Sequence, residues 1–454
     1  MFRQHPWDLP PPATRDAPVV QPGALTRSTL SNGVRVIALE DRSLPRVALG
    51  VTLRRGAGSV PPESAGQASF ATALMAQGAG EMDALALALA VDEIGASISV
   101  NAGWDATTVA LSGLSRDLDR LVEILAAVVR EPVFDDGEAG RIRSRQLAGL
   151  RQAQDSPGTI ASWQAARALY PDHRYGLPMS GTLESVERLD APAARAYYQR
   201  IFRPENAIVF ASGDIDAADW ARRSERAFGD WESRGEDASE TPAPPDPAPS
   251  IRRIVVVDKP ELGQARIVVT HGGIARNSER RLAAGLVNNV LGGSGFSSRL
   301  MKRIRSDEGL TYGVASHFSM RRQPGPFSVS TFTRVPEARR VVDLILQGIQ
   351  GIRDNPPSEL ELATTKSYAV GRFGLNLETS ASVLASIVSL DVYGLPEDAL
   401  DTYRARIRAI DLDDTAAVAR DLFHPTRCVI VVLGPAKDLV PQLEGLGDVS
   451  VITP

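Results

Sequence analysis

The feature that most restricts the fold of this chain is an internal repeat, offset by about 220 residues. In the first half, "GWDATTVALSGLSRDLDRLVEILAAVVREP" has the pattern of a strand, a turn, a helix and a proline. In the second half, "PGPFSVSTFTRVPEARRVVDLILQGIQGIRDNP" has the same order, which aligns residues 120–122 with 340–342. Another polar helical stretch follows each copy. The repeat therefore predicts one structural unit built twice.

The pattern within each half predicts the fold class. The stretches "NGVRVIALED" and "RVALGVTLRRGAGS" in the first half, and "IRRIVVVDKP" and "QARIVVTHGG" in the second, have the pattern of strands. Neighbouring strands joined by short turns and followed by helices favour antiparallel modules over an alternating parallel fold. We predict an α+β protein of two similar domains, each a mainly antiparallel sheet with helices packed on it.

A proline-rich stretch divides the two predicted domains. Residues 234–250, "RGEDASETPAPPDPAPS", contain five prolines among acidic and small residues, which is typical of an extended linker. We therefore place the N-terminal domain at 24–233 and the C-terminal domain at 251–454. Residues 1–23, also rich in proline, are predicted to form an extended N-terminal segment.

Composition excludes several classes of protein. The net charge of −5, without a block of Lys or Arg, argues against a nucleic-acid partner. The only cysteine, Cys428, cannot form an intramolecular disulfide or a multi-cysteine metal site. No run approaches the roughly 20 apolar residues of a membrane span, so we expect a soluble protein. Basic residues are mostly arginine, which suggests a bacterial source. The compartment stays open, with the Pro-rich start favouring the periplasm over the cytoplasm.

Four segments, in order, carry a family resemblance. They are "LSNGVRVIALED" (30–41), "RRGAGSVPPESAG" (54–66), "DHRYGLPMSGTLESVERL" (172–189) and "YYQRIFRPENAIVFASGDID" (197–216). Together they resemble the insulinase/pitrilysin family of zinc metallopeptidases, in the two-domain form of mitochondrial processing peptidase and its bacterial relatives. The likeness extends over nearly the whole chain after about residue 24.

The resemblance implies a zinc site, and this chain lacks its residues. Catalytic members carry His-x-x-Glu-His, whose two imidazoles lie on one helical face and reach the metal while the Glu serves as general base. The aligned positions here are Ser69, Thr72 and Ala73, and Gly149 stands at the third ligand position. We therefore expect no metal and no cofactor in this chain. Ser69 and Thr72 lack the setting of a nucleophile, which favours a helix of small residues packed on its sheet.

The family's second signature is an Arg and a Tyr seven residues apart, and both are present. In "SSRLMKRIRSDEGLTYGVASHF" the matching residues are Arg305 and Tyr312. A phenolic O–H is a suitable donor to the oxygen that gains negative charge during peptide hydrolysis. An arginine can hold substrate carbonyls or orient that tyrosine. The resemblance therefore assigns this pair a catalytic role that completes a partner's site.

A glycine-rich loop precedes this pair. "LGGSGFSSRL" (291–300) lacks the Gly-Lys-Ser/Thr of a phosphate-binding loop. It resembles the substrate-guiding loop of the noncatalytic processing-peptidase subunit, so Gly292, Gly293 and Gly295 are candidates for substrate contact. A simple helix-entry turn is the alternative. His271 and His317 are isolated in strands and are not expected to bind metal.

Loss of one half of the site and retention of the other suggest a division of labour between two chains. The first hypothesis is the noncatalytic subunit of a heteromeric zinc endopeptidase that cleaves peptides or small unfolded proteins. Its partner would be a homologous subunit with His-x-x-Glu-His and the zinc, to whose sheet edge substrate adds as a strand. The second hypothesis is an inert structural or binding protein of the same fold.

Overall fold

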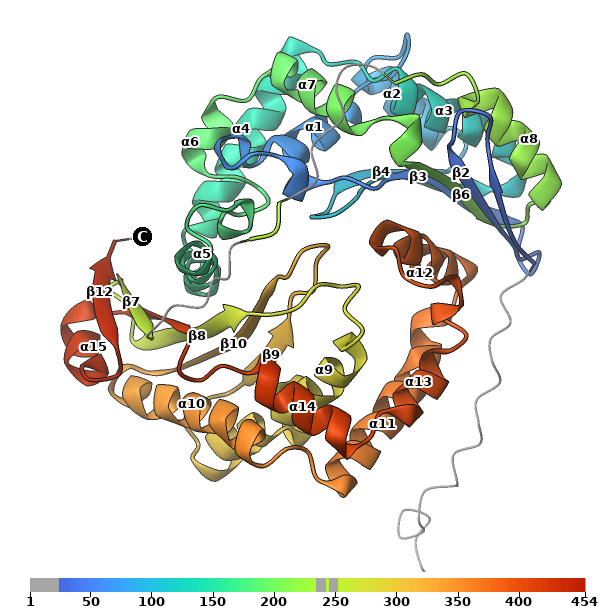
Figure 1. Cartoon of the computed structure of the whole chain (residues 1–454). Helices are drawn as coiled ribbons and strands as arrows, with labels where there is room; N and C mark the ends of the chain where they lie inside the picture. Colours follow the sequence, from blue (N-terminus) through green and yellow to red (C-terminus); the bar gives the residue numbers. More distant parts are fainter. Residues whose placement is uncertain (1–23, 234–241, 245–251, 454) are drawn as a thin grey trace, which may run out of the picture.

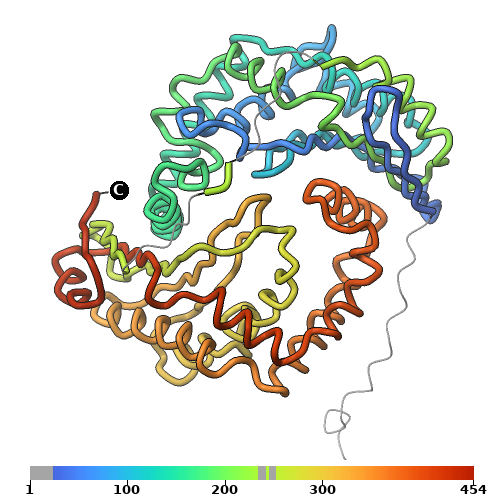
Figure 2. Tube along the Cα trace, in the orientation of Figure 1, coloured from blue at the N-terminus to red at the C-terminus, as the bar shows by residue number. Residues whose placement is uncertain are grey.

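The computed structural model of the chain describes residues 24–233, 242–244 and 252–453. The predicted N-terminal segment 1–23 lies outside the described residues, and so does most of the predicted linker 234–250. Two mixed sheets of six strands, each with its own helices, face one another across the molecule (Figures 1 and 2). This arrangement confirms the predicted α+β fold of two similar domains.

The first sheet has the strand order β1-β2-β6-β3-β5-β4, and only its β2–β6 pair is parallel. Its central strands are buried along most of their length, so the middle of the sheet is covered on both faces, whereas the strands at its β4 edge alternate in burial. Its strands are β1 (Leu25–Thr29), β2 (Arg35–Glu40), β3 (Arg46–Leu53), β4 (Ser97–Ala102), β5 (Thr107–Leu114) and β6 (Ala207–Gly213). The helices of this half are α1 (Gln67–Met75), α2 (Ala84–Asp92), α3 (Leu118–Arg130), α4 (Asp136–Ala153), α5 (Pro157–Leu169), α6 (Leu183–Glu187), α7 (Ala191–Ile201) and α8 (Ala217–Phe228).

The second sheet has the order β12-β7-β11-β8-β10-β9, with β7 parallel to both β11 and β12. Its strands are β7 (Arg253–Asp258), β8 (Gln264–Gly272), β9 (Val314–Phe318), β10 (Pro326–Arg334), β11 (Val429–Gly434) and β12 (Asp448–Ile452). The helices of this half are α9 (Arg281–Asn288), α10 (Ala338–Asp354), α11 (Glu359–Phe373), α12 (Ser380–Tyr393), α13 (Tyr403–Ala409), α14 (Leu412–Leu422) and α15 (Ala436–Leu443). The short helical segments η7 (Asn289–Gly293), η8 (Gly295–Ser297), η9 (Met301–Asp307) and η11 (Gly374–Leu377) lie between them.

The internal repeat corresponds to a repeated succession of elements. The hairpin β4–β5 and helices α3, α4 and α5 recur as the hairpin β9–β10 and helices α10, α11 and α12. Helix α3 forms because Leu121, Leu125 and Val128 recur at helical spacing and are all buried. The outermost strands break the repeat, because β1 pairs antiparallel to β2 whereas β12 pairs parallel to β7.

The two halves exchange one helix each. Helix α5 of the first half buries Ile160 and Leu169 in one cluster with Val431 and other valines of β7, β8 and β11. In return, α12 of the second half buries Ile387 and its neighbours against β2 and β6. Figure 1 shows both helices lying over the sheet of the opposite half. Each sheet is therefore covered on its second face by a helix from the other half.

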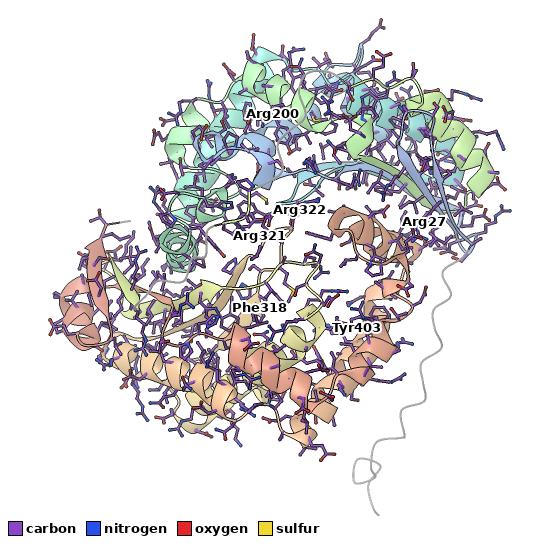
Figure 3. The ribbon with its side chains drawn as sticks, in the orientation of Figure 1. Arg27, Arg200, Phe318, Arg321, Arg322 and Tyr403 are labelled. Carbon is purple, nitrogen blue, oxygen red and sulfur yellow. The ribbon has the colours of Figure 1, made fainter. Side chains whose placement is uncertain are left out.

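The tips of the two equivalent hairpins also meet between the halves. The guanidinium of Arg321 lies 4.0 Å from the ring centroid of Trp104 and 4.3 Å from that of Tyr175. Asp105 accepts hydrogen bonds from the backbone N–H of Arg322 at 3.0 Å and from the Tyr393 hydroxyl at 3.1 Å. Figure 3 shows Arg321 and Arg322 at this junction. Tyr175 belongs to "DHRYG", so this segment contributes an interdomain contact as well as a turn.

The side chain of His271 is fully buried at the end of β8, and its environment keeps it neutral. Its Nδ1 donates to the carbonyl of Gly272 at 2.7 Å, which leaves Nε2 to accept from the backbone N–H of His424 at 3.2 Å. The ring stacks on Phe327 and meets the His424 ring edge-on. Burial lowers the pKa of His271 to about 3. The description of His271 as isolated was therefore wrong, because His424 is distant in sequence and adjacent in space.

Among residues 24–233, 242–244 and 252–453, no single helix is long and apolar enough to cross a membrane. The bent pair formed by 359–377 and 380–393 has sufficient length and composition, with an angle of 111° between its two parts. The second part of that pair is α12, whose apolar side chains pack on the first sheet.

Truncation of α12 at the exchanged interface should destabilise the whole fold. We expect Ile387→Ala to lower the free energy of unfolding by about 2–5 kcal/mol, because it removes a buried branched side chain from an interface that cannot fully collapse. Urea denaturation followed by circular dichroism measures this change. Leu360→Ala, at a site 77% exposed on α11, is the matched control and should change stability by less than about 0.5 kcal/mol. Equal losses of unfolding free energy in the two variants would show that Ile387 of α12 stabilises the fold no more than a residue on a surface helix.

The buried His271 predicts a pH dependence of stability. Because its folded pKa lies below the unfolded value of 6.5, its contribution is complete above pH 6.5 and is lost as the pH falls toward about 3. This group alone should add a slope of about 1.4 kcal/mol per pH unit below its unfolded pKa. Unfolding titrations between pH 7 and pH 5 should show a shallower slope for His271→Leu than for the wild type. In the control His317→Gln, the free energy of unfolding should keep most of its dependence on pH. An unchanged pH dependence in His271→Leu would refute the assignment of this slope to His271.

Candidate functional site

Helix α1 carries the positions of the lost zinc motif. It begins after Gly66, whose φ of +92° is in the left-handed region and whose position allows the backbone of Ser180 to approach closely. The Gln146 amide of α4 donates to the carbonyls of Gly66 at 3.2 Å and Ser180 at 2.8 Å. The start of α1 is therefore fixed against α4, which carries the third ligand position.

The side chains at the four motif positions are used for packing or are absent. The Thr72 hydroxyl is buried and donates to the carbonyls of Ala68 at 2.9 Å and Ser69 at 3.2 Å, within its own helix. The Ser69 hydroxyl donates to the carbonyl of Met179 at 3.3 Å. Ala73 packs against the core of the first half. Gly149 is exposed, and a Cβ at that position would meet no atom within 4 Å.

These positions do not fit a zinc ion. Zinc in proteins is held by thiolate, imidazole or carboxylate groups, and Ala73 and Gly149 offer no side-chain donor while the Thr72 hydroxyl is occupied by backbone. Across 24–233, 242–244 and 252–453, no three His, Cys, Asp or Glu side chains are grouped so as to hold a metal ion. The helix of small residues predicted from the sequence is what α1 forms.

Arg305 lies on η9, a helix wound in wide π-helical turns. Such turns are rare and frequent at functional sites. The acidic neighbour Glu308 pairs with Arg303 at 3.0 Å and Arg340 at 2.8 Å. In the part of the chain that the structure describes, no carboxylate contacts the guanidinium of Arg305. Its charge is therefore not compensated by a local ion pair.

Tyr312 is 79% exposed at a turn just before β9. The turn is held from both sides by threonines. The backbone N–H of Gly313 donates to the Thr311 hydroxyl at 3.1 Å, and Thr331 of β10 donates to the carbonyl of Gly313 at 2.8 Å. Thr333 donates to the carbonyl of Leu310 at 2.7 Å. An exposed phenol on a fixed backbone can donate a hydrogen bond to a bound molecule without reordering the chain.

The structure brings Arg305 and Tyr312 together and adds a third residue. The Arg305 guanidinium lies 5.1 Å from the ring centroid of Tyr312 and 4.5 Å from that of Phe296. Phe296, in the glycine-rich loop, is itself 69% exposed. Aromatic faces attract a cation and restrict its orientation. Sequence reasoning missed Phe296, although an aromatic residue within a loop of Gly and Ser was a usable signal.

The glycines of the loop allow close packing and a left-handed backbone turn that larger residues would hinder. A Cβ on Gly292 would lie 2.5 Å from the Ser316 hydroxyl of β9, and one on Gly293 would lie 2.8 Å from the Asn288 amide. Gly295 has a φ of +62° and open space around it. These glycines allow the loop to pack against β9 and then turn, so that Phe296 is brought over Arg305.

The two halves of the family site remain apart in this chain. Ser69, Thr72, Ala73 and Gly149 lie on α1 and α4, whereas Arg305 and Tyr312 lie beside β9 in the other half. Among the described residues, no hydrogen bond, ion pair or ring contact joins η9 or the Tyr312 turn to α1 or α4. Arg305 and Tyr312 can therefore contact a group that does not belong to α1 or α4 of the same chain.

Restoring the ligands should restore metal binding if the alignment is correct. We expect the triple variant Ser69→His, Ala73→His, Gly149→Glu to take up close to one zinc ion per chain, because the two histidines share a face of α1 and α4 is fixed beside it. Metal analysis after dialysis measures this uptake, with the wild type as the reference. A control that places the glutamate one residue earlier, Ala148→Glu with the same histidines, should bind more weakly. Equal uptake by wild type and triple variant would refute the assigned ligand positions.

Comparison with known proteins identifies the family of this chain. The family description "Insulinase (Peptidase family M16)" matches residues 35–183, and "Peptidase M16 inactive domain" matches residues 188–368. An uncharacterized zinc protease of Streptomyces coelicolor is 25% identical over 92% of this chain and 91% of its own length. A protein of Helicobacter pylori named as a non-peptidase homolog is 22% identical over 87% of this chain and 90% of its own length.

A solved structure supports the same assignment of fold. The structure of a peptidase M16 inactive domain from Pseudomonas fluorescens superposes with a TM-score of 0.83 at 24% identity, covering 90% of this chain and 98% of that one. Together, the two matched segments and the shared fold extend over most of the chain. This protein belongs to the insulinase family of metallopeptidases, peptidase family M16.

Proposed function

We propose that this chain is the noncatalytic subunit of a heteromeric zinc metallopeptidase that cleaves peptides or small unfolded proteins. In this proposal, a homologous subunit with His-x-x-Glu-His supplies the zinc site, and Arg305 and Tyr312 of this chain complete it. The observation that carries the proposal is the contact between the exposed Tyr312 and the partly buried Arg305, which has no carboxylate partner among the described residues, in a chain without zinc ligands at the family positions.

The free-energy cost of keeping Arg305 unpaired and Tyr312 exposed supports a functional role for both residues. A half-buried guanidinium without a carboxylate partner gives up hydration without a Coulomb gain in return. An exposed tyrosine leaves its large ring in water, although burial of aromatic rings is strongly favourable. A purely structural role would be better served by an ion pair or by packing the ring inward. Recognition of a bound peptide accounts for both features.

The chemistry of the pair suits a peptide substrate. The Tyr312 hydroxyl can donate to the carbonyl oxygen that becomes negatively charged when the peptide bond is attacked. The planar guanidinium of Arg305 offers several N–H donors to neighbouring carbonyls, and the ring of Phe296 limits its rotation. The backbone that carries Tyr312 is held by Thr331 and Thr333, which lowers the reorganisation required at the reaction step.

An inert structural or binding protein is the second candidate. The four non-ligating motif positions favour it, and the Helicobacter pylori relative carries a non-peptidase name. The two candidates differ in what they require of Arg305 and Tyr312. An inert protein loses nothing when either is replaced, whereas the proposed subunit loses turnover.

Substitution of Tyr312 in the assembled enzyme tests the proposal. The complex is to be purified from the native cell through a tag on this chain and assayed with unfolded peptide substrates. We expect Tyr312→Phe to leave assembly intact and to reduce kcat by roughly 100- to 1,000-fold, the usual cost of losing one donor to a developing oxyanion. Arg305→Gln should reduce kcat/KM as well, through weaker binding of substrate carbonyls.

Arg303→Gln is the matched control, because Arg303 lies on the same helix and pairs with Glu308 outside the site. It should assemble and turn over like the wild type. Capture of no zinc-bearing subunit, or unchanged turnover in Tyr312→Phe, would contradict the proposal and favour the inert protein.

A further inference from the structure

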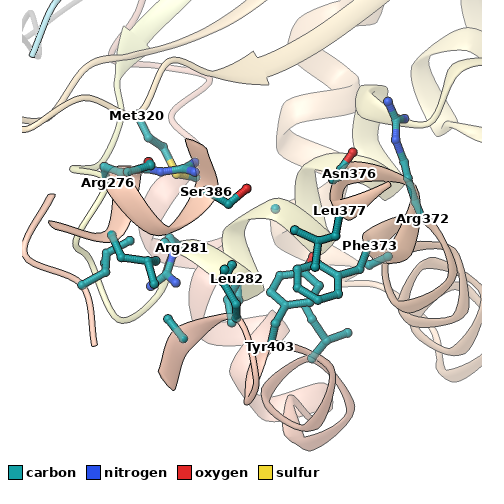
Figure 4. Close-up of a pocket in the computed structure, with 18 of the residues that line it drawn as sticks. Arg276, Arg281, Leu282, Met320, Arg372, Phe373, Asn376, Leu377, Ser386 and Tyr403 are labelled. Atoms are coloured by element: carbon teal, nitrogen blue, oxygen red, sulfur yellow. The ribbon is translucent and has the colours of Figure 1, made fainter. Parts of the chain in front are cut away.

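A large pocket opens within the C-terminal half, between α9, α11 with η11, α12 and α13. Its volume of about 650 Å³ lies in the range of small-molecule sites. Figure 4 shows Arg276 and Arg281 at one end and Arg372 at the other, with Leu282 and Phe373 between them. The pocket is separate in the fold from the turn that carries Tyr312.

The charged residues that line this pocket are all positive. Three arginines line it, and no Asp or Glu is among its lining residues. Within the described chain, neither Arg276 nor Arg281 forms a side-chain hydrogen bond or an ion pair. Arg281 is half-buried, and burial together with the neighbouring charges of Arg406 and Arg276 lowers its pKa. Arg276 lies 5.9 Å from the ring centroid of Tyr393, and neither guanidinium has a carboxylate counter-ion among the described residues.

Much of the remaining wall of the pocket is apolar, and Asn289, Asn376, Ser386 and Ser389 add neutral polar groups to it. Leu282, Leu286 and Met320 line it, as do the stacked rings of Phe373 and Tyr403, whose centroids are 4.3 Å apart. Gly285 of α9 also lines it, and a Cβ at Gly285 would meet no atom within 4 Å. This combination of an apolar wall with a few convergent polar groups is the composition of a ligand site.

We propose that this pocket binds an amphipathic organic anion, a molecule with a carboxylate or phosphate head and an apolar body. Arg276 and Arg281 hold the head, because paired guanidinium groups donate several charge-assisted hydrogen bonds to such oxyanions. The apolar body lies along Leu282, Phe373 and Tyr403. This site is independent of the proposed peptidase role, since it uses neither Arg305 nor Tyr312.

Calorimetric titration with dodecanoate, dodecyl phosphate, dodecanol and inorganic phosphate tests the site on the full chain. We expect the two dodecyl anions to bind and Arg281→Gln to weaken both by roughly 10- to 100-fold, the usual value of a charge-assisted contact. Preference for one anion identifies the head as carboxylate or phosphate. Dodecanol binding as tightly as dodecanoate, or inorganic phosphate binding as tightly as dodecyl phosphate, would overturn the proposal.

Two further variants separate binding from folding. Gly285→Leu should fill the pocket and abolish anion binding while keeping the wild-type thermal midpoint, because its side chain enters open space. Arg280→Gln is the matched control, since Arg280 adjoins Arg281 but pairs with Asp421 at 3.0 Å outside the pocket. Binding that survives Gly285→Leu, or that falls equally in Arg280→Gln, would place the anion elsewhere and refute the site.

Discussion

The exchange of helices α5 and α12 is the interaction on which the remaining structure depends. Each sheet has one face covered by helices of its own half and the other face covered by a helix from the opposite half. Burial of these apolar faces provides the main favourable term in folding, so neither half completes its core alone. The reciprocal contact also fixes the two hairpin tips against each other, where Arg321 lies between Trp104 and Tyr175.

In the proposed function this chain lacks one half of a reaction centre and supplies the other, and the two halves lie in different parts of the paired domains. Of the four zinc-motif positions on α1 and α4, Thr72 is buried, Ser69 and Ala73 are partly buried, and Gly149 is exposed. Arg305, Tyr312 and Phe296 form a cluster on the surface of the second half, supported by threonines of β10 and by packing of the glycine loop on β9. Among the described residues no hydrogen bond, ion pair or ring contact joins the two regions, so a substitution in one removes no such interaction from the other.

Much of this arrangement could be predicted from local patterns. The repeat predicted two similar domains because hydrophobic spacing is a local property of strands and helices. The positions of Ser69, Thr72, Ala73 and Gly149 followed from alignment to a motif on two helices. Phe296 was missed although it lies close to Arg305 in the sequence, whereas the pocket around Arg281 could not be predicted in this way, because it is assembled from helices that are distant in the sequence. The partner of His271 was missed for the same reason, since His424 is brought to it only by packing of the second core.

The amino-acid sequence by itself determined which chemistry this protein lacks and which it keeps. No arrangement of the backbone can give Ala73 or Gly149 a metal-binding side chain, and the resemblance assigns Arg305 and Tyr312 their roles from the sequence alone. Tertiary structure decided that Tyr312 is exposed, that Arg305 contacts no carboxylate among the described residues, and that Phe296 joins the pair. It also decided which helix covers which sheet. The physical reason is that exposure, charge pairing and helix exchange are properties of contacts between distant segments, and those contacts form only when the two halves pack.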